Sequence, residues 1–210
     1  MDGRSGHPVT RRTTLAGACL LLAGCAGGDG GAGDGATGGG DTTGGDATDD
    51  DPATGEVTQM GDLTLTSPAF DDGAQIPEKY GYTEANVNPP LRIEGVPEGA
   101  ESLALVVDDP DAREPAGKVW DHWVVWNVPP DRTDIPEGWK PTDAVEGTND
   151  FGGVGYGGPN PPDKAHRYRF KLFALDATLD LPQATDAAAL GEAMDGHVLA
   201  GTQLDGTYPA

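Results

Sequence analysis

Residues 59–210 contain short runs of β-forming residues, and this pattern constrains the fold more than any other feature of the chain. Gly, Pro, Asn and Asp separate the runs, as turns between strands require. We therefore expect an all-β dominated fold, an antiparallel β-sandwich with a few peripheral helices. The runs are Leu63–Thr66, Leu103–Val107, His122–Val128, Arg167–Leu175 and Gln203–Tyr208.

One segment has helical periodicity. Residues 185–200 are rich in Ala, and three apolar residues spaced four apart would lie on one face of a helix. These are Leu190, Met194 and Val198. Thr185 or Asp186 is a suitable N-cap, and Gly201 would end the helix. We predict a helix over this segment, with His197 in a structural or exposed position.

The first 24 residues resemble an export signal. The pair Arg11-Arg12 precedes a short apolar stretch, residues 15–23, which is too short to span a bilayer. Paired arginines resemble a twin-arginine signal, and the residues that end in Cys25 resemble a lipobox, whose cysteine receives a lipid. We expect removal of residues 1–24 and attachment to the outer face of the cytoplasmic membrane through Cys25. An ordinary cleaved signal with a chance cysteine is the alternative.

A tether follows the signal. Residues 26–58 contain 12 Gly, eight acidic residues and no basic residue. Such a composition does not offset the entropy of ordering a backbone. We therefore expect residues 25–58 to form a disordered, self-repelling tether, and residues 59–210 to form the single folded domain.

The chain is strongly acidic, with a formal net charge of −22. This argues against nucleic acid or an anionic membrane surface as a partner, because both bind basic faces. We expect contact with a membrane only through the lipid anchor. In residues 59–210 the 26 acidic residues outnumber 10 basic ones and are spread along the chain. Such a surface suggests a high-salt setting, where screening relieves self-repulsion.

The domain offers little for nucleophilic catalysis. Its serines, Ser67 and Ser102, lie outside any Gly-x-Ser-x-Gly elbow. Cys19 would leave with the signal and Cys25 would carry lipid, so no free thiol would remain. Phosphate loops of the Walker type are absent from the sequence. We expect a protein that is not an enzyme, without catalytic residues and without a cofactor.

Polar residues gather in two parts of the sequence, each with a histidine at the start of an expected strand. Asp109–Asp111 precedes Trp120–His122, and the Gly-rich segment Phe151–Pro162 precedes His166–Tyr168. In each part an aromatic residue lies two positions from the histidine, so the two share one face of a strand. If the strands are neighbours, imidazole, hydroxyl and backbone donors converge, and convergent donors suit the oxygens of an anion.

We therefore predict a small pocket for a phosphate-type anion or a phosphorylated headgroup. His122 and His166 would donate to the anion, Tyr168 would add a hydroxyl, and Asp109 would fix an imidazole tautomer. Trp120 and the stiff proline segment would shape the mouth. Two half-buried structural histidines are the alternative. A metal site made from the same His and Asp residues is another, but no close His-x-His spacing favours it, and we expect no metal.

Four motifs in order resemble the phosphatidylethanolamine-binding protein family, in its bacterial and archaeal branch, often labelled Raf-kinase-inhibitor-like. The motifs are DPDA at Asp109–Ala112, HWVVWNVP at His122–Pro129, GYGGPNPP at Gly155–Pro162 and HRYRFKLFAL at His166–Leu175. The resemblance implies a β-sandwich of two antiparallel sheets and a small anion-binding pocket. The residues implied for the pocket are Asp109, Asp111, Trp120, His122, Gly158, Pro161, Pro162, His166 and Tyr168.

The chain also departs from the family pattern. Asn88 stands where relatives often have Ser, and Asn160 where bacterial relatives often have Cys. Arg113 follows DPDA where Pro is common, and an insert at residues 114–119 lengthens the loop before Trp120. These departures affect the expected shape of the pocket's mouth and the ligand that the pocket would accept.

Two further functions stay open at this point. The resemblance implies kinase-regulatory or protease-inhibitory roles in some relatives, for which a binding loop near Asn149–Pro162 would matter most. A hydrolase or metal enzyme that uses the same His and Asp residues is the second alternative. The basic residues Arg167, Arg169 and Lys171 alternate with apolar ones. We expect them on a solvated strand face, paired with surface acids, with a surface for lipid headgroups or an acidic partner as the weaker interpretation.

Overall fold

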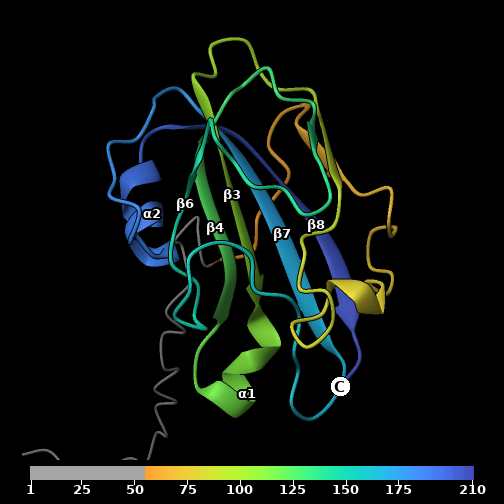
Figure 1. The fold of residues 1–210 in the computed structure, drawn as a ribbon. Coiled ribbons are helices and arrows are strands. Elements are labelled where there is room, and N and C mark those ends of the chain that lie inside the picture. The colour runs from red at the N-terminus through yellow and green to blue at the C-terminus, as the bar shows by residue number, and fades with distance from the viewer. Residues whose placement is uncertain (1–54) are drawn as a thin grey trace, which may run out of the picture. The chain divides into compact units, whose positions relative to one another are not determined.

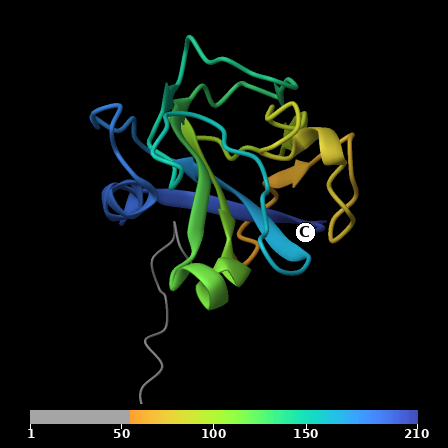
Figure 2. The same ribbon diagram turned by 60° about the horizontal axis from the view of Figure 1, so that its bottom comes forward.

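The computed structural model describes residues 55–210 as a sandwich of two antiparallel sheets (Figures 1 and 2). One sheet has the strand order β6-β4-β3-β7-β8, and the other has the order β1-β2-β5. The expectation of an all-β dominated fold is thus confirmed. The strands are β1 (Thr64–Thr66), β2 (Leu91–Glu94), β3 (Ser102–Asp109), β4 (Trp120–Val128), β5 (Asp134–Ile135), β6 (Val145–Glu146), β7 (His166–Leu175) and β8 (Val198–Tyr208). The helices are α1 (Arg113–Ala116), α2 (Ala187–Met194) and the 3-10 helices Glu78–Tyr80 and Pro110–Ala112.

The signal, the lipobox with Cys25 and most of the expected tether lie outside the described residues. Residues 55–58, which we expected in the tether, are described, and Val57 donates a backbone hydrogen bond to the side chain of Gln203 in β8. The last part of the expected tether therefore contacts the folded domain.

The main core lies between the two sheets, and a second core lies under α2 on the other face of the five-stranded sheet. All eight residues of β3 are buried, because the strand is central and covered on both faces, which explains its uninterrupted apolar run. In β4 the alternation sends Trp123 to the main core and Trp126 to the second core. Large members of the main core include Leu63, Ile76, Leu91, Ile93, Leu105, Trp123, Phe170 and Leu172.

The predicted helix over residues 185–200 is shorter than expected. Asp186 caps α2 by accepting a hydrogen bond from the amide of Ala189, one of the two caps that the sequence suggested. The helix ends at Met194, and Gly196 has a positive φ of 79°. Residues from 198 onward then form the eleven-residue strand β8, because ten of its residues pair along β7. The prediction that the helix runs to residue 200 is therefore wrong.

The expectation of a solvated basic face on β7 is also wrong. Lys171 has a relative exposure of 0% and Arg169 of 4%, and both form ion pairs with the fully buried carboxylate of Asp108. This face of the five-stranded sheet is covered by α2 and by the segment before β1, so strand alternation alone did not reveal which face meets water. Only Arg167 is half-exposed.

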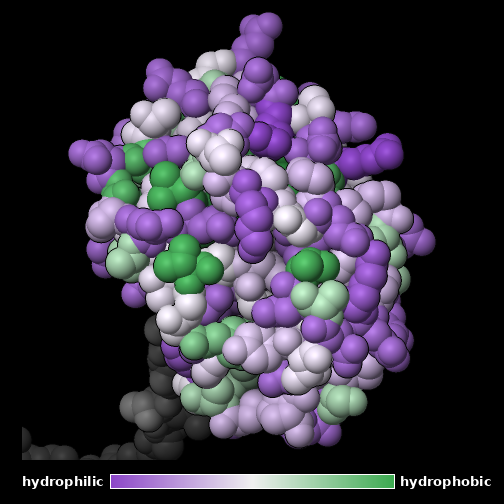
Figure 3. All heavy atoms as spheres, viewed as in Figure 1, coloured by the Kyte–Doolittle hydropathy of each residue, from purple (hydrophilic) through white to green (hydrophobic). Residues whose placement is uncertain are grey.

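The face of the molecule in Figure 3 is mostly hydrophilic, with apolar residues in small separate patches. Among the described residues no helix has the length and apolar character needed to cross a membrane.

Candidate functional site

A cavity of about 240 Å³ lies where the adjacent ends of β3, β4 and β7 meet. These strands are neighbours in the sheet, so two distant parts of the sequence contribute to one site. Helix α1 lies between the end of β3 and the start of β4 (Figure 2), and its Glu114 bonds to Lys164 in the loop that leads into β7. The lining residues are Asp109, Ala112, Pro115, Ala116, Trp120, His122, Phe151, Asn160, Pro162 and His166.

A β-bulge in β4 positions His122. Val107 pairs with Trp123, but the next residue of β3, Asp108, pairs with Asp121, which leaves His122 as an extra residue. A bulge of this kind redirects a side chain relative to the regular pleat. Here it allows the imidazole to face the cavity together with Trp120, while Trp123 stays in the core.

His122 is held in one tautomer by the Gly-rich loop. Its Nδ1 atom lies 2.7 Å from the carbonyl oxygen of Gly157. A carbonyl only accepts, so Nδ1 carries the proton and the Nε2 atom of the neutral ring is an acceptor. Burial lowers the pKa of His122, which favours this neutral form. The expectation that His122 donates to an anion therefore needs correction: its free nitrogen offers a lone pair.

His166 lies between two carboxylates. Its Nδ1 is 2.7 Å from Oδ2 of Asp109, which is buried, and its Nε2 is 2.9 Å from Oδ1 of Asp163. Burial by itself would lower the pKa of His166, but the hydrogen bonds and charges of Asp109 and Asp163 outweigh it and raise the pKa. The imidazolium form, which donates from both nitrogens, fits this geometry. The outer donor is occupied by Asp163, whose side chain is 47% exposed.

Two buried donors at the site have no hydrogen-bond partner among the described residues. They are the hydroxyl of Tyr168 and the indole Nε1 of Trp120. Tyr168 lies behind His122, with the two rings edge-to-face at 5.1 Å. Burial, followed by the charge and the nearby side chain of Asp109, raises the pKa of Tyr168, so its hydroxyl stays protonated. The hydroxyl lies near Asp109 but makes no hydrogen bond of good geometry with it. Buried polar groups are nearly always paired, and unpaired donors beside a cavity indicate capacity for a ligand.

The walls of the cavity are mainly apolar. Phe151 is stacked on Tyr82 at 4.1 Å and meets the edge of His122 at 5.4 Å. Pro115 and Ala116, both in α1, form another part of the wall. The site thus combines a polar floor with apolar sides, as is typical of small-molecule pockets.

Two exposed ion pairs connect the segment around α1 to the neighbouring loops. Glu114 pairs with Lys164 in the loop before β7, at 2.6 Å. Lys118 pairs with Asp150 at 2.6 Å and also lies over the ring of Trp120. The insert at residues 114–119, which we expected to lengthen a loop, therefore contributes a short helix to the pocket wall.

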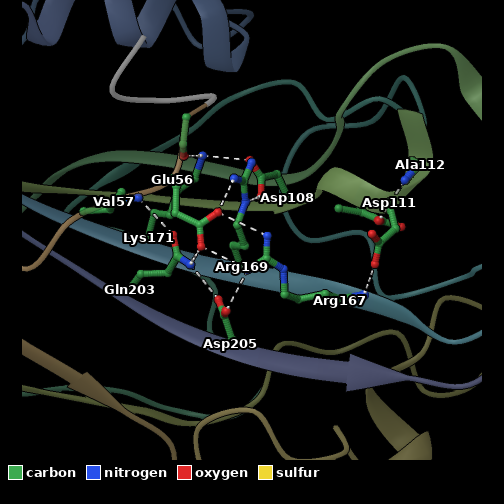
Figure 4. A network of polar contacts seen from close by, with 12 residues as sticks. Glu56, Val57, Asp108, Asp111, Ala112, Arg167, Arg169, Lys171, Gln203 and Asp205 are labelled. Atoms are coloured by element: carbon green, nitrogen blue, oxygen red, sulfur yellow. Dashed lines mark hydrogen bonds and ion pairs between the residues drawn. The ribbon is translucent and has the colours of Figure 1, made fainter. Parts of the chain in front are cut away.

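The structure brings five of the nine expected site residues to the cavity lining, and the other four lie behind its surface, with Tyr168 behind the ring of His122. Asp111 turns away and accepts a hydrogen bond from the amide of Arg167 (Figure 4). Gly158 donates to Asn86, and a side chain at this position would meet the backbone of Tyr80. Pro161 is buried and does not line the cavity. Asp111, Gly158 and Pro161 shape the site and do not present groups to it.

Sequence reasoning missed several residues of the site. The most important is Asp163, which lies three positions before His166 and is bonded to it. Its position shortly before a histidine in a connecting loop was the sequence feature that could have indicated this contact. Pro115 and Ala116 belong to the insert, where no strand pattern places them. Phe151 lies in the Gly-rich segment, and only the fold shows that its ring reaches the cavity.

Within residues 55–210 no group of three or more His, Cys, Asp or Glu side chains is arranged to hold a metal ion. The paired histidines and aspartates at the cavity instead bond to one another and to backbone groups.

A family model described as phosphatidylethanolamine-binding protein matches residues 66–209. The chain belongs to the phosphatidylethanolamine-binding protein family. The match spans β2 to β8, helices α1 and α2 and the whole cavity described above. The family description is that of a binding protein, and not that of an enzyme.

One archaeal relative and two bacterial solved structures are similar to this chain over nearly their whole length. A UPF0098 protein from Methanothermobacter thermautotrophicus is 46% identical over 151 residues, which cover 70% of this chain and 98% of that protein. A solved structure of a putative phosphatidylethanolamine-binding protein homologue from Chlamydia trachomatis has a TM-score of 0.67 and 41% identity, with coverage of 71% and 98%. YbcL of E. coli has a TM-score of 0.66 and 34% identity, with coverage of 70% and 98%.

Proposed function

We propose that the cavity binds a small phosphate-type anion, either free or as the headgroup of a phosphorylated lipid. The observation that carries the proposal is the arrangement around His166. Its imidazolium has one N–H directed to the buried Asp109, while the other is held by Asp163, a carboxylate that is 47% exposed on a loop. Asp163 thus occupies the position that an oxygen of a bound anion would take.

In the proposed complex the anion displaces Asp163 and accepts a hydrogen bond from Nε2 of His166. The unpartnered hydroxyl of Tyr168 and the indole N–H of Trp120 supply further donors. His122 offers an acceptor, because its Nδ1 is bonded to the Gly157 carbonyl. An acceptor beside several donors suits a ligand with both oxygens and a proton to donate, such as a monoprotonated phosphate or a phosphate that carries an amine.

The proposal is tested by isothermal titration of the protein with inorganic phosphate and with phosphoethanolamine. Tyr168→Phe removes one buried hydroxyl and keeps the ring. A hydrogen bond to a charged group is worth about 1.5–3 kcal/mol, so binding should weaken about 10- to 150-fold. Tyr82→Phe is the matched control: it removes a hydroxyl from the ring stacked on Phe151, and it should leave affinity unchanged.

Equal affinity of Tyr168→Phe and the parent protein would contradict the proposed binding mode. Binding of phosphoethanolamine without binding of phosphate would identify the headgroup as the relevant form. Binding of both with similar affinity would identify the phosphate group alone as what the site recognises.

We further propose that the protein is exported and held at the outer face of the membrane by a lipid on Cys25. The paired arginines and the lipobox-like residues before Cys25 support this proposal. Mass spectrometry of protein from the membrane fraction should find a chain that begins at Cys25 and carries a diacylglycerol-type mass. Cys25→Ser should release the protein from the membrane, and an intact chain that retains residues 1–24 would contradict the proposal.

A further inference from the structure

Residues 55–57, which precede β1, contact the face of the five-stranded sheet that carries Arg169 and Lys171. Figure 4 shows Glu56 and Val57 beside the side chains of β7 and β8. The carbonyl oxygen of Gly55 lies 3.4 Å from Nζ of Lys171. Glu56 forms an ion pair with Arg167, and the amide of Val57 donates to the side chain of Gln203 at 3.1 Å. Main-chain and side-chain groups of the segment are thus both recognised by β7 and β8.

The contact with Glu56 has the geometry of carboxylate recognition. Nη1 of Arg167 lies 3.0 Å from one carboxylate oxygen and Nη2 lies 3.2 Å from the other. Nη1 of Arg169 lies 3.6 Å from the second oxygen. Two-pronged contact between a guanidinium and a carboxylate is strong and geometrically specific. Basic side chains are few in this chain of net charge −22, and two of them lie beside the one carboxylate of Glu56.

The segment reaches β8 and pairs with it through one isolated bridge. Met60 forms an antiparallel bridge with Gly201, with a hydrogen bond of 2.8 Å from its amide to the Gly201 carbonyl. Further back along the segment, Val57 reaches Gln203. A Cβ atom at Gly201 would stand 3.1 Å from the side chain of Val57, so the glycine leaves room for the segment. Residues 55–57 bond to side chains of β7 and β8, and the main-chain bond of Met60 follows them, so side-chain contacts dominate the recognition of this segment.

We propose that β7 and β8 form a binding site for an extended acidic peptide segment, and that residues 55–57 of the same chain are its resident ligand. The required ligand is an extended strand with a carboxylate that faces Arg167, preceded by a carbonyl group that faces Lys171. In this role the site fixes the point at which the N-terminal part of the chain leaves the domain.

The site depends on solvent-accessible charges as well as buried ones. The side chain of Glu56 is 60% exposed and that of Arg167 is 38% exposed, so salt screens their attraction. Arg169 and Lys171 keep their buried partner Asp108 whether or not Glu56 is bound. The segment is therefore able to detach without leaving these two cations unpaired.

The inference does not rest on the proposed anion pocket, because the pocket uses the alternate residues of the same strands. The first test is hydrogen exchange of the Val57 and Met60 amides in the full-length chain. Glu56→Gln keeps the size of the side chain and removes its charge. The pair is partly exposed, and exposed ion pairs contribute only modestly to stability, so both amides should exchange about two- to fivefold faster.

Glu98→Gln is the matched control, since Glu98 is an exposed carboxylate in the turn before β3. It should leave exchange at Val57 and Met60 unchanged. Unchanged exchange in Glu56→Gln would overturn the proposed role of Glu56 as the ligand carboxylate.

The second test separates a binding site from an internal structural contact. A synthetic peptide with the sequence of residues 53–60 is added to the 15N-labelled Glu56→Gln chain, and amide shifts of Arg167, Arg169 and Gln203 are followed. The peptide should shift these amides, whereas a peptide with Gln in place of Glu should not. Absence of shifts with both peptides would overturn the site and leave only an internal ion pair.

Discussion

The two faces at the adjoining ends of β3 and β7 have opposite polar character, although they are built from alternate residues of the same strands. On the cavity face, Asp109 and His166 are joined to each other, and Tyr168 has a hydroxyl without a partner among the described residues. On the back face, Asp108 forms ion pairs with both Arg169 and Lys171. The cavity face thus has a hydroxyl donor without a partner among the described residues, whereas the buried charges of the back face are paired with one another.

Side chains of a strand alternate between its two faces, so the same strands can stabilise the sheet on one face and line a cavity on the other. A donor that is buried without a partner carries a desolvation cost that a ligand relieves. A buried carboxylate with two cationic partners has no such unfilled capacity. The back face therefore contributes to the integrity of the sheet and contacts residues 55–57, while the cavity face carries the donors that the proposed anion would use.

The largest expected effect comes from removing the shared anion of the back face. Asp108→Ala leaves the buried side chains of Arg169 and Lys171 without their common partner. Breaking a buried ion pair from one side costs about 3–5 kcal/mol, so the free energy of unfolding should fall by about this amount in urea titrations. The exposed Asp131→Ala should change it by no more than about 0.5 kcal/mol. A small loss for Asp108→Ala would contradict the division between the faces.

The sequence predicted the sheet better than it predicted the faces. Alternation and turn residues located the main strands, and the continuous apolar run of β3 indicated a central strand. The basic residues of β7 were placed in solvent because alternation identifies two faces without saying what covers each. The cover consists of α2 and residues 55–58, and neither is local in sequence to β7.

The site was predictable where a motif lies on a strand and less so where it lies in a loop. Trp120, His122 and His166 line the cavity, as strand geometry suggested. The direction of hydrogen bonds was not predictable, because the partner of His122 is a backbone carbonyl thirty-five residues away. The contact between Asp163 and His166 likewise depends on the path of a loop that has no periodic pattern.

A second prediction concerns Asp121, whose Oδ1 is buried without a partner among the described residues. Burial, then repulsion by Asp150 and Asp108, raises its pKa to about 7. The folded state thus binds a proton that the unfolded state releases above its ordinary pKa near 3.9. Stability should therefore fall as pH rises from about 4 to about 7, and stay low above that range.

Asp121→Asn should remove this penalty. A shift of about 3 pKa units corresponds to at most about 4 kcal/mol, so the variant should gain up to that amount at pH 8 and gain little at pH 4. Urea titrations across this pH range check the result, with Asp131→Asn as a control that removes an exposed carboxylate. Parallel pH profiles for Asp121→Asn and the parent would show that the carboxyl group ionises freely in the fold.

A third prediction tests whether Asp163 competes with the ligand. Asp163→Ala frees the outer N–H of His166, so affinity for inorganic phosphate should increase about two- to fivefold, the range of an exposed ion pair. Asp180→Ala makes the same change of charge at another exposed position and should have no comparable effect. Titration calorimetry at fixed ionic strength measures both, and weaker binding after Asp163→Ala would show that this carboxylate supports the site.

The pH dependence of phosphate binding also tests whether Asp163 interacts with His166. The pKa of His166 is raised by Asp109 and Asp163, so its charge persists up to a higher pH than the ordinary value near 6.5. Affinity for phosphate should decline as pH rises through that raised pKa. In Asp163→Ala one of the two carboxylates is gone, and the decline should move to lower pH. A profile that does not move would mean that Asp163 contributes little to the charge of His166.

The smallest expected effect concerns the exposed pair of Glu114 and Lys164, which joins α1 to the loop before β7. Water and salt screen exposed ion pairs, and the entropy of ordering two long side chains offsets much of what remains. Lys164→Ala should therefore leave the urea midpoint unchanged within error, in contrast to Asp108→Ala. If it lowers the midpoint clearly, the pair anchors α1; if it does not, packing of Pro115 and Ala116 at the cavity suffices to hold that wall in place.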